Sequence, residues 1–264
     1  MAIVAQLLFA VMLAAAGYFF YQSIQKIRRN ILLGKDIELN DHPEERRNIM
    51  FRVALGQSKM VVRPVAGILH ILIYVGFLIV NAEMLEILID GLFGTHRVLS
   101  VLGAGYNALT GIVEIMMLLV VIASVGFLAR RNLVKVPRFT SPELKGFPTT
   151  DANLILITEI TLMFALFTMN AADQALQQKG AEHYIQAGYF PVSSLLVGAF
   201  SGMSEGTLIF LERSGWWIHI LGILAFLNYI PRSKHLHIFL TFPNTYYSRL
   251  AAKGKMTNME SITQ

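Results

Sequence analysis

The sequence predicts an all-α integral membrane protein built as a bundle of five membrane-spanning helices. Hydrophobic residues make up 55% of the 264 positions and the mean hydropathy is +0.54, which is too apolar for an ordinary soluble domain. Five apolar segments also approach the roughly 20 residues that a helix needs to cross a hydrocarbon core. They are expected at residues 3–21, 64–89, 106–128, 152–172 and 216–230.

Local signals define the elements in chain order. The first span has no basic residue before its apolar run and continues into GYFFYQ, so we expect a retained anchor rather than a cleaved signal peptide. Pro64 suits the first position of the second helix, and the third span is the uninterrupted apolar run that follows Tyr106. Thr149 and Thr150 are N-cap candidates for the fourth. A sixth stretch, residues 190–203, is too short to span and is expected to be interfacial or re-entrant, before the last span.

Lysine and arginine predict the orientation. Of 22 such residues, nineteen fall in the loops after the first and third spans or after the fifth, and the other three are Arg97, Lys179 and Arg213. By the positive-inside rule, the N-terminus lies outside and the C-terminus is cytoplasmic. We therefore expect a multi-pass protein of a bacterial or archaeal cytoplasmic (inner) membrane. The basic loops account for the net charge of +5, and no nucleic-acid partner is expected.

The domain organisation is simple. We expect one membrane domain over residues 1–240 and a polar, basic cytoplasmic tail over residues 241–264, where an acidic partner or an appended soluble domain would dock. The sequence contains no cysteine, so this chain supplies no thiolate ligands for an iron–sulfur cluster. Any such cluster must belong to a partner.

Two histidines of the fifth span are spaced for cofactor binding. His219 and His237 are eighteen residues apart. In one continuous helix that separation is five turns and about 27 Å, so both rings would leave the same face, one near each membrane surface. His235 would point about 160° away and is the weaker candidate. Interfacial histidines at helix ends are the alternative, but ionisable groups within spans are functional candidates.

A haem b held by two histidines needs imidazoles on facing helices. His70 lies six residues into the second helix, about 9 Å along its axis, at a depth comparable with His237 on the antiparallel fifth helix. We therefore expect the pair His70 and His237 to hold a cytoplasmic-side haem. His219 would hold a second haem, for which His96 is a candidate partner that fits a ligand and a surface residue equally well. One or two haems are expected.

Several charged residues are candidates for contacts with haem propionates or for proton transfer. Arg63, Arg232 and Lys234 lie at a depth suited to haem propionates, although plain positive-inside anchoring explains them too. Glu114 and Glu159 lie inside the third and fourth spans, where a carboxylate is costly unless neutral, paired or hydrated. They are candidates for the proton transfers that accompany quinone chemistry. Protonated glutamates that bond across helices are the alternative.

The chain resembles the membrane cytochrome b family that includes the gamma subunit of respiratory nitrate reductase and the membrane subunit of heterodisulfide reductase. The resemblance rests on five spans with the N-terminus outside, on VALGQSKMVVRPVAGILH at the entry to the second helix, and on the fifth-helix pattern His219, Pro231 and His237. It is similar above all to the N-terminal membrane part of heterodisulfide-reductase-type iron–sulfur oxidoreductases, including those linked to electron-transfer flavoprotein.

The resemblance implies haem b ligation at His70, His219 and His237. It also implies electron exchange between a cytoplasmic iron–sulfur partner and the menaquinone or ubiquinone pool, with the chain as the membrane subunit or domain of a quinone-linked oxidoreductase. One departure is Val80, which stands where the nitrate reductase pattern has a second histidine. The alternative function is a cofactor-free membrane scaffold or small transporter whose glutamates line a substrate path.

Overall fold

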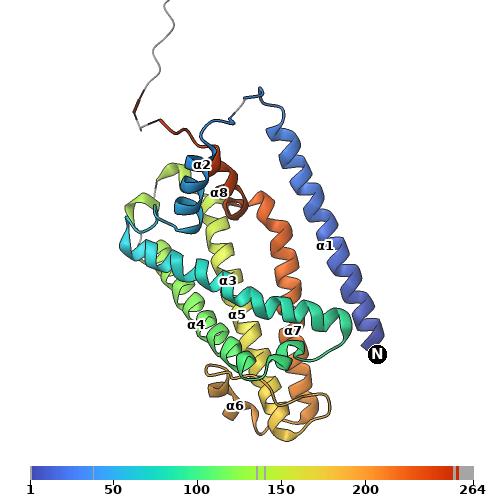
Figure 1. Ribbon diagram of the computed structural model, residues 1–264. Coiled ribbons are helices and arrows are strands. Elements are labelled where there is room, and N and C mark those ends of the chain that lie inside the picture. The colour runs from blue at the N-terminus through green and yellow to red at the C-terminus, as the bar shows by residue number, and fades with distance from the viewer. Residues whose placement is uncertain (1, 38, 135, 140, 252–253, 256–264) are drawn as a thin grey trace, which may run out of the picture.

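The computed structural model describes residues 2–37, 39–134, 136–139, 141–251 and 254–255. Five long helices dominate it (Figure 1), and each is long and apolar enough to cross a membrane. All the secondary structure in the described residues is helical. The five helices are α1 (Ala2–Ile31), α3 (Pro64–Phe93), α4 (Ala104–Asn132), α5 (Phe147–Lys179) and α7 (Glu205–Tyr229). The prediction of a five-helix membrane protein is confirmed.

The helices extend beyond the apolar segments from which they were predicted. The largest difference is in α7, which begins at Glu205, eleven residues before the expected start at Trp216. The Ser204 hydroxyl accepts a hydrogen bond from the Thr207 amide at 3.2 Å and caps this end. The negative charge of Glu205 also suits the first turn of a helix. His219 consequently lies in the middle of α7 rather than near its outer end.

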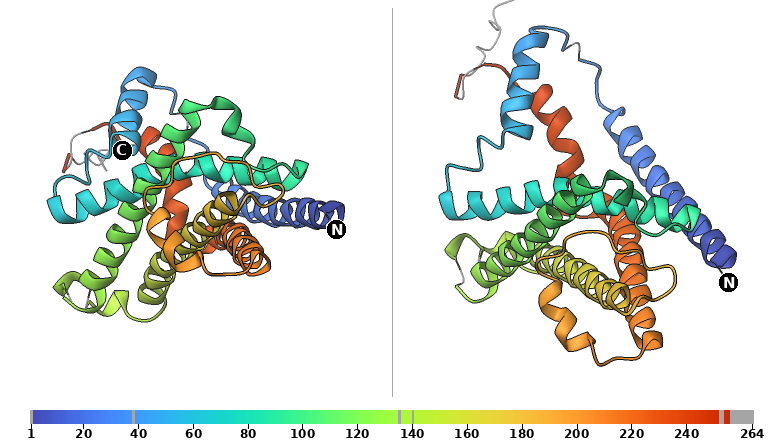
Figure 2. Two further views of the ribbon diagram at one scale, coloured as in Figure 1. Left: turned by 90° about the horizontal axis from the view of Figure 1, so that it is seen from below. Right: turned by 60° about the horizontal axis from the view of Figure 1, so that its bottom comes forward.

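Helix α5 is at the centre of the bundle. It packs against α7 on one side and α4 on the other, α3 packs on α4, and α1 contacts both α7 and α3. A Cβ atom at Gly215 would lie 2.7 Å from the Ala165 carbonyl oxygen, so the absence of a side chain there allows α7 to approach α5 closely. The core between the helices includes Met117, Leu166 and Ile220, all fully buried. In Figures 1 and 2, α3 crosses α5 and α7 steeply.

The prediction that His219 and His237 lie on one continuous helix is wrong. Helix α7 ends at Tyr229, two short 3-10 turns follow, and a separate helix α8 (His237–Tyr246) begins at His237 itself. Pro231 accounts for the break, because its ring lacks an amide hydrogen and clashes with the preceding turn. Asp151 on α5 stabilises the break by accepting hydrogen bonds from the Tyr229 hydroxyl at 2.6 Å and the Lys234 amide at 3.1 Å.

Helix α8 is held by the short helix α2 (Pro43–Met50), which packs beside it (Figure 1). The contact depends on Arg46, which is 2% exposed. Its guanidinium donates to the carbonyl oxygens of Tyr246 and Ser248 at 3.1 and 3.0 Å, and to Asp41 Oδ1 at 2.7 Å. The expected domain boundary at residue 240 thus falls inside α8, and residues 252–253 and 256–264 of the expected tail lie outside the described residues.

The short stretch before the last span forms helix α6 (Ser194–Phe200), as expected for a segment that does not span. Glu114 of α4 fixes the chain that leads into it. The carboxylate is fully buried and accepts hydrogen bonds from the Val192 and Ser193 amides, both at 2.8 Å, and from the Ser193 hydroxyl. Glu114 therefore anchors the loop between α5 and α7 on the bundle.

Candidate haem and quinone sites

His70 and His237 face each other at the end of the bundle where α3 and α8 begin. Their ring centroids are 6.4 Å apart and the ring planes are inclined by 48°. Two imidazole nitrogens that bind one metal from opposite sides, each at about 2 Å, lie about 4 Å apart, which places the ring centroids roughly 6 Å apart. The spacing therefore fits a metal ion between the rings.

Each of these histidines has a ring nitrogen available for a metal. His237 Nδ1 lies 2.9 Å from the Lys234 carbonyl oxygen, so it carries the proton and leaves Nε2 with a free lone pair. His70 is partly buried, and its Nδ1 atom is fully buried with no hydrogen-bond partner in the described residues. A buried nitrogen without a partner is costly unless a ligand satisfies it. The donor set therefore fits haem iron with two axial imidazoles.

The three cations predicted for haem propionates lie on the surface at this end of the bundle. Arg63 immediately precedes α3, whereas Arg232 and Lys234 belong to the turns between α7 and α8. All three are exposed. Lys234 Nζ contacts the Pro148 carbonyl oxygen at 3.4 Å, and burial of part of its side chain lowers the Lys234 pKa.

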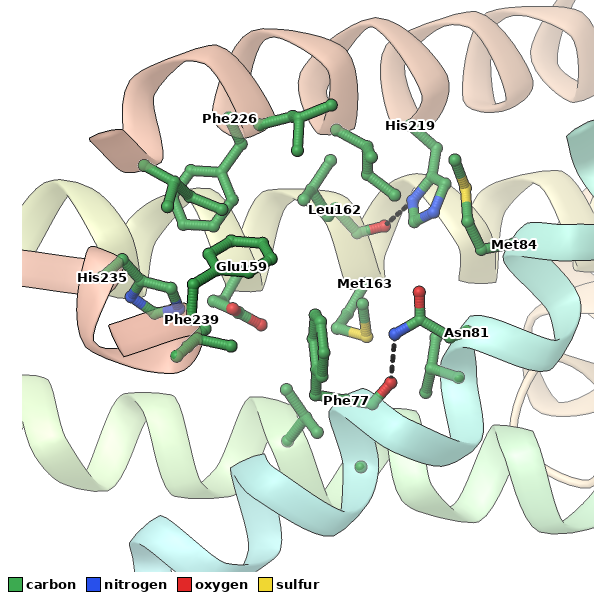
Figure 3. Close-up of a pocket in the computed structure, with 17 residues that line it drawn as sticks. Phe77, Asn81, Met84, Glu159, Leu162, Met163, His219, Phe226, His235 and Phe239 are labelled. Carbon is green, nitrogen blue, oxygen red and sulfur yellow. Dashed lines mark hydrogen bonds between the residues drawn. The ribbon is translucent and has the colours of Figure 1, made fainter. Parts of the chain in front are cut away.

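A second candidate site is a cavity of about 200 Å³ between α3, α5 and α7, closed at one end by α8. Its lining is mostly apolar, and the polar exceptions are Asn81, Glu159, His219 and His235. Figure 3 shows the Glu159 carboxyl pointing into the space, with His219 and His235 at its two ends. His235 reaches the cavity because α7 stops at Tyr229. Burial, with a smaller contribution from the neighbouring His237, lowers the pKa of the His235 imidazole to about 4.

His219 is 1% exposed and its tautomer is set by the backbone. Nδ1 lies 3.0 Å from the Leu162 carbonyl oxygen, whereas Nε2 is buried without a hydrogen-bond partner in the described residues. On the α3 side of the cavity the buried residues are Gly76, Val80 and Met84. Helix α3 therefore presents no second imidazole to His219, and the other imidazole of the cavity, His235, lies at its opposite end.

His96 lies elsewhere, in the loop between α3 and α4, and is not among the residues that line the cavity. Its Nε2 atom is 3.0 Å from Asp173 Oδ1, and its ring packs against Tyr184. The structure therefore does not bring His96 to His219.

Asp173 and His96 belong to a buried polar cluster that the sequence reasoning missed. Arg97, 5% exposed, is its centre. The Arg97 guanidinium pairs with Asp173 Oδ2 at 2.7 Å, donates to Asn170 Oδ1 at 2.7 Å and lies 3.5 Å from Glu83 Oε1. Burial alone would lower the pKa of Arg97, but Asp173 and the other acidic neighbours raise it well above its usual value. The available signal in the sequence was the pair of acidic residues Glu83 and Glu86 within the second apolar segment, together with Arg97 in the loop that follows it.

Two comparisons gave no match: no family model matches the chain, and no solved structure matches it significantly. The chain is similar to the probable iron-sulfur-binding oxidoreductase FadF of Bacillus subtilis (strain 168), with 29% identity over 254 residues that cover 96% of this chain and 34% of the relative. It is also similar to the EtfAB:quinone oxidoreductase of Syntrophomonas wolfei subsp. wolfei (strain DSM 2245B / Goettingen), with 24% identity over 266 residues that cover 96% and 35%.

The chain therefore spans about a third of the length of these curated relatives. Both are named as oxidoreductases, which agrees with an oxidoreductase-associated membrane chain. Neither name mentions a cytochrome b.

Proposed function

We propose that this chain is the electron-transfer membrane part of a quinone-linked oxidoreductase in the cytoplasmic membrane, and that it holds haem b between His70 and His237. The observation that carries the proposal is the pair of facing imidazoles, 6.4 Å apart between ring centroids. Haem bound there would supply a one-electron carrier. The names of the two relatives, one iron–sulfur-binding and one acting between EtfAB and quinone, support this class.

The protein's part is to position the ligands. Lys234 orients His237 through its backbone carbonyl group, and Asp151 holds the turn that carries Lys234. Arg63 and Arg232 supply positive charge at the same end of the bundle, suited to propionate groups. An iron–sulfur protein or cluster domain, or electron-transfer flavoprotein, would exchange electrons at this basic end, and a menaquinone or ubiquinone would do so within the membrane.

The experiment is a dithionite-reduced minus air-oxidised absorbance spectrum of the purified chain, produced with sufficient haem. We expect a b-type spectrum, and we expect His70→Ala or His237→Ala to abolish the haem they share. His42→Ala and His183→Ala are matched controls because both side chains are exposed, and both variants should keep the parent spectrum. A parent without b-type absorbance, or unchanged haem in both His70→Ala and His237→Ala, would contradict the proposal.

A further inference from the structure

We propose that the cavity between α3, α5 and α7 binds the ring of a quinone between His219 and Glu159. The inference deepens the proposed function and rests on it, because it names the place where the quinone exchanges electrons and protons. It also assigns His219 to a quinone oxygen rather than to haem iron, in contrast to the ligation that the family resemblance implies.

The size and walls of the cavity favour a small ring. At about 200 Å³ it is smaller than the roughly 300–1,000 Å³ typical of sites for drug-sized ligands, and a haem macrocycle is larger than a quinone ring. Val80 and Met84 line the α3 side of the cavity, and α3 presents no second histidine to His219 there. The arrangement differs from that of His70 and His237, whose imidazoles face each other directly.

His219 offers one polar contact. Because its Nδ1 hydrogen is used by the Leu162 carbonyl oxygen, the buried Nε2 atom is an acceptor. A hydroxyl group of a quinol can donate to it. This contact would satisfy a nitrogen that otherwise has no partner among the described residues, which is the kind of buried atom that calls for a ligand.

Glu159 offers the second contact. It lies on α5 three residues before Leu162, about 4.5 Å along the helix axis, and therefore on the same face. Figure 3 shows its carboxyl and the His219 ring facing the same space. A carboxyl group in an apolar span is costly without a partner, and a quinone oxygen that exchanges a proton provides one.

The cavity also has a route for an apolar tail. Phe77 and Phe239 line it and are 47% and 44% exposed on the surface that would face lipid. Phe239 lines in addition an apolar groove of about 320 Å³ between α1 and α8. The quinone ring would enter past these two phenylalanines, and its isoprenoid tail would lie in the groove.

Glu159 and His219 can accept both protons that a quinol releases on oxidation. On oxidation of the quinol, the hydroxyl proton at one oxygen passes to the Glu159 carboxylate and the proton at the other oxygen passes to His219 Nε2. Both O–H bonds break, two electrons leave one at a time toward the redox partner of the proposed function, and the ring becomes a quinone. Reduction reverses each transfer: two electrons arrive from that partner, and Glu159 and His219 return their protons to the two oxygens.

The test uses the purified full chain and 2,3-dimethyl-1,4-naphthoquinone, with binding measured by equilibrium dialysis. We expect His219→Gln to weaken binding about tenfold, as for loss of one buried hydrogen bond, and Val80→Trp to abolish binding by filling the cavity. Glu159→Gln should slow reduction of the oxidised haem by the reduced probe about 10²-fold at saturation, as for loss of a proton-transfer group. His42→Gln and Glu143→Gln are the matched controls on exposed residues.

The haem content of each variant distinguishes a failure of the quinone site from a failure of the proposed function. We expect His219→Gln and Val80→Trp to keep the haem content and helical circular dichroism of the parent. A loss of haem in His219→Gln would make His219 a haem ligand and overturn the inference, as would parent-like probe binding in both variants. If the parent has no b-type absorbance but the variants lose probe binding, the proposed function fails and the quinone site stands.

Discussion

At the scale of single residues, burial and hydrogen bonding separate the seven histidines into different roles. His42 and His183 are exposed, whereas His219 is 1% exposed with a free Nε2 atom. His70 and His237 combine a free nitrogen with a facing ring. A histidine is therefore a haem-ligand candidate here because it combines a free ring nitrogen with a facing imidazole, and not because it lies in an apolar segment.

The Arg97 cluster gives a prediction at this scale. Arg97→Gln leaves the buried Asp173 carboxylate without its main cationic partner, and removal of one partner of a buried pair costs about 3–5 kcal/mol. We expect a large fall in the midpoint of thermal unfolding in detergent. Arg97→Gln/Asp173→Asn should be less destabilised than the single variant, because position 173 then carries no unpaired charge. Lys179→Gln, which changes an exposed cation, is the control, and parent-like stability of Arg97→Gln would disprove the role of the pair.

At the scale of elements, helix α2 determines how firmly α8, and with it His237, is held. Arg46 makes charge-assisted hydrogen bonds to two carbonyl groups at the end of α8, each worth about 1.5–3 kcal/mol. We expect Arg46→Ala to raise hydrogen exchange over residues 237–246 at least tenfold. Arg47→Ala is the matched control, because Arg47 is its exposed neighbour in α2. Equal protection of α8 in both variants would show that Arg46 does not hold it.

The break after α7 explains why one histidine prediction from the sequence was unaffected and another was not. The pairing of His70 with His237 depended on comparable depth, which a break in the last helix does not remove. The position of His235 depended on a continuous helix, and the break at Pro231 placed His235 in the cavity. Proline within a membrane helix is tolerated in many proteins, so the residue alone did not predict the break. The Asp151 contacts that fix it join α5 to the turn after α7, and such contacts are not visible in a linear sequence.

At the scale of the whole molecule, the membrane bundle was predictable because hydropathy and helix length are properties of continuous segments. The buried polar cluster was not, since it joins Glu83 of α3, Arg97 of the following loop and Asp173 of α5. A single arginine after a span looks like an ordinary interfacial residue in sequence. Only the packing of α3, α4 and α5 brings its partners within bonding distance.

The orientation of the whole bundle remains a prediction from basic residues, and the absence of cysteine from the sequence makes it directly testable. Single cysteines introduced at two exposed positions report on opposite ends of the bundle: Ser201→Cys lies between α6 and α7, and Glu143→Cys lies between α4 and α5. We expect a membrane-impermeant maleimide to label Ser201→Cys on intact cells and Glu143→Cys only after permeabilisation, because the basic loops stay in the cytoplasm. The parent chain is the unlabelled control. The reverse labelling pattern would place the His70 and His237 end outside, where a cytoplasmic redox partner does not reach it.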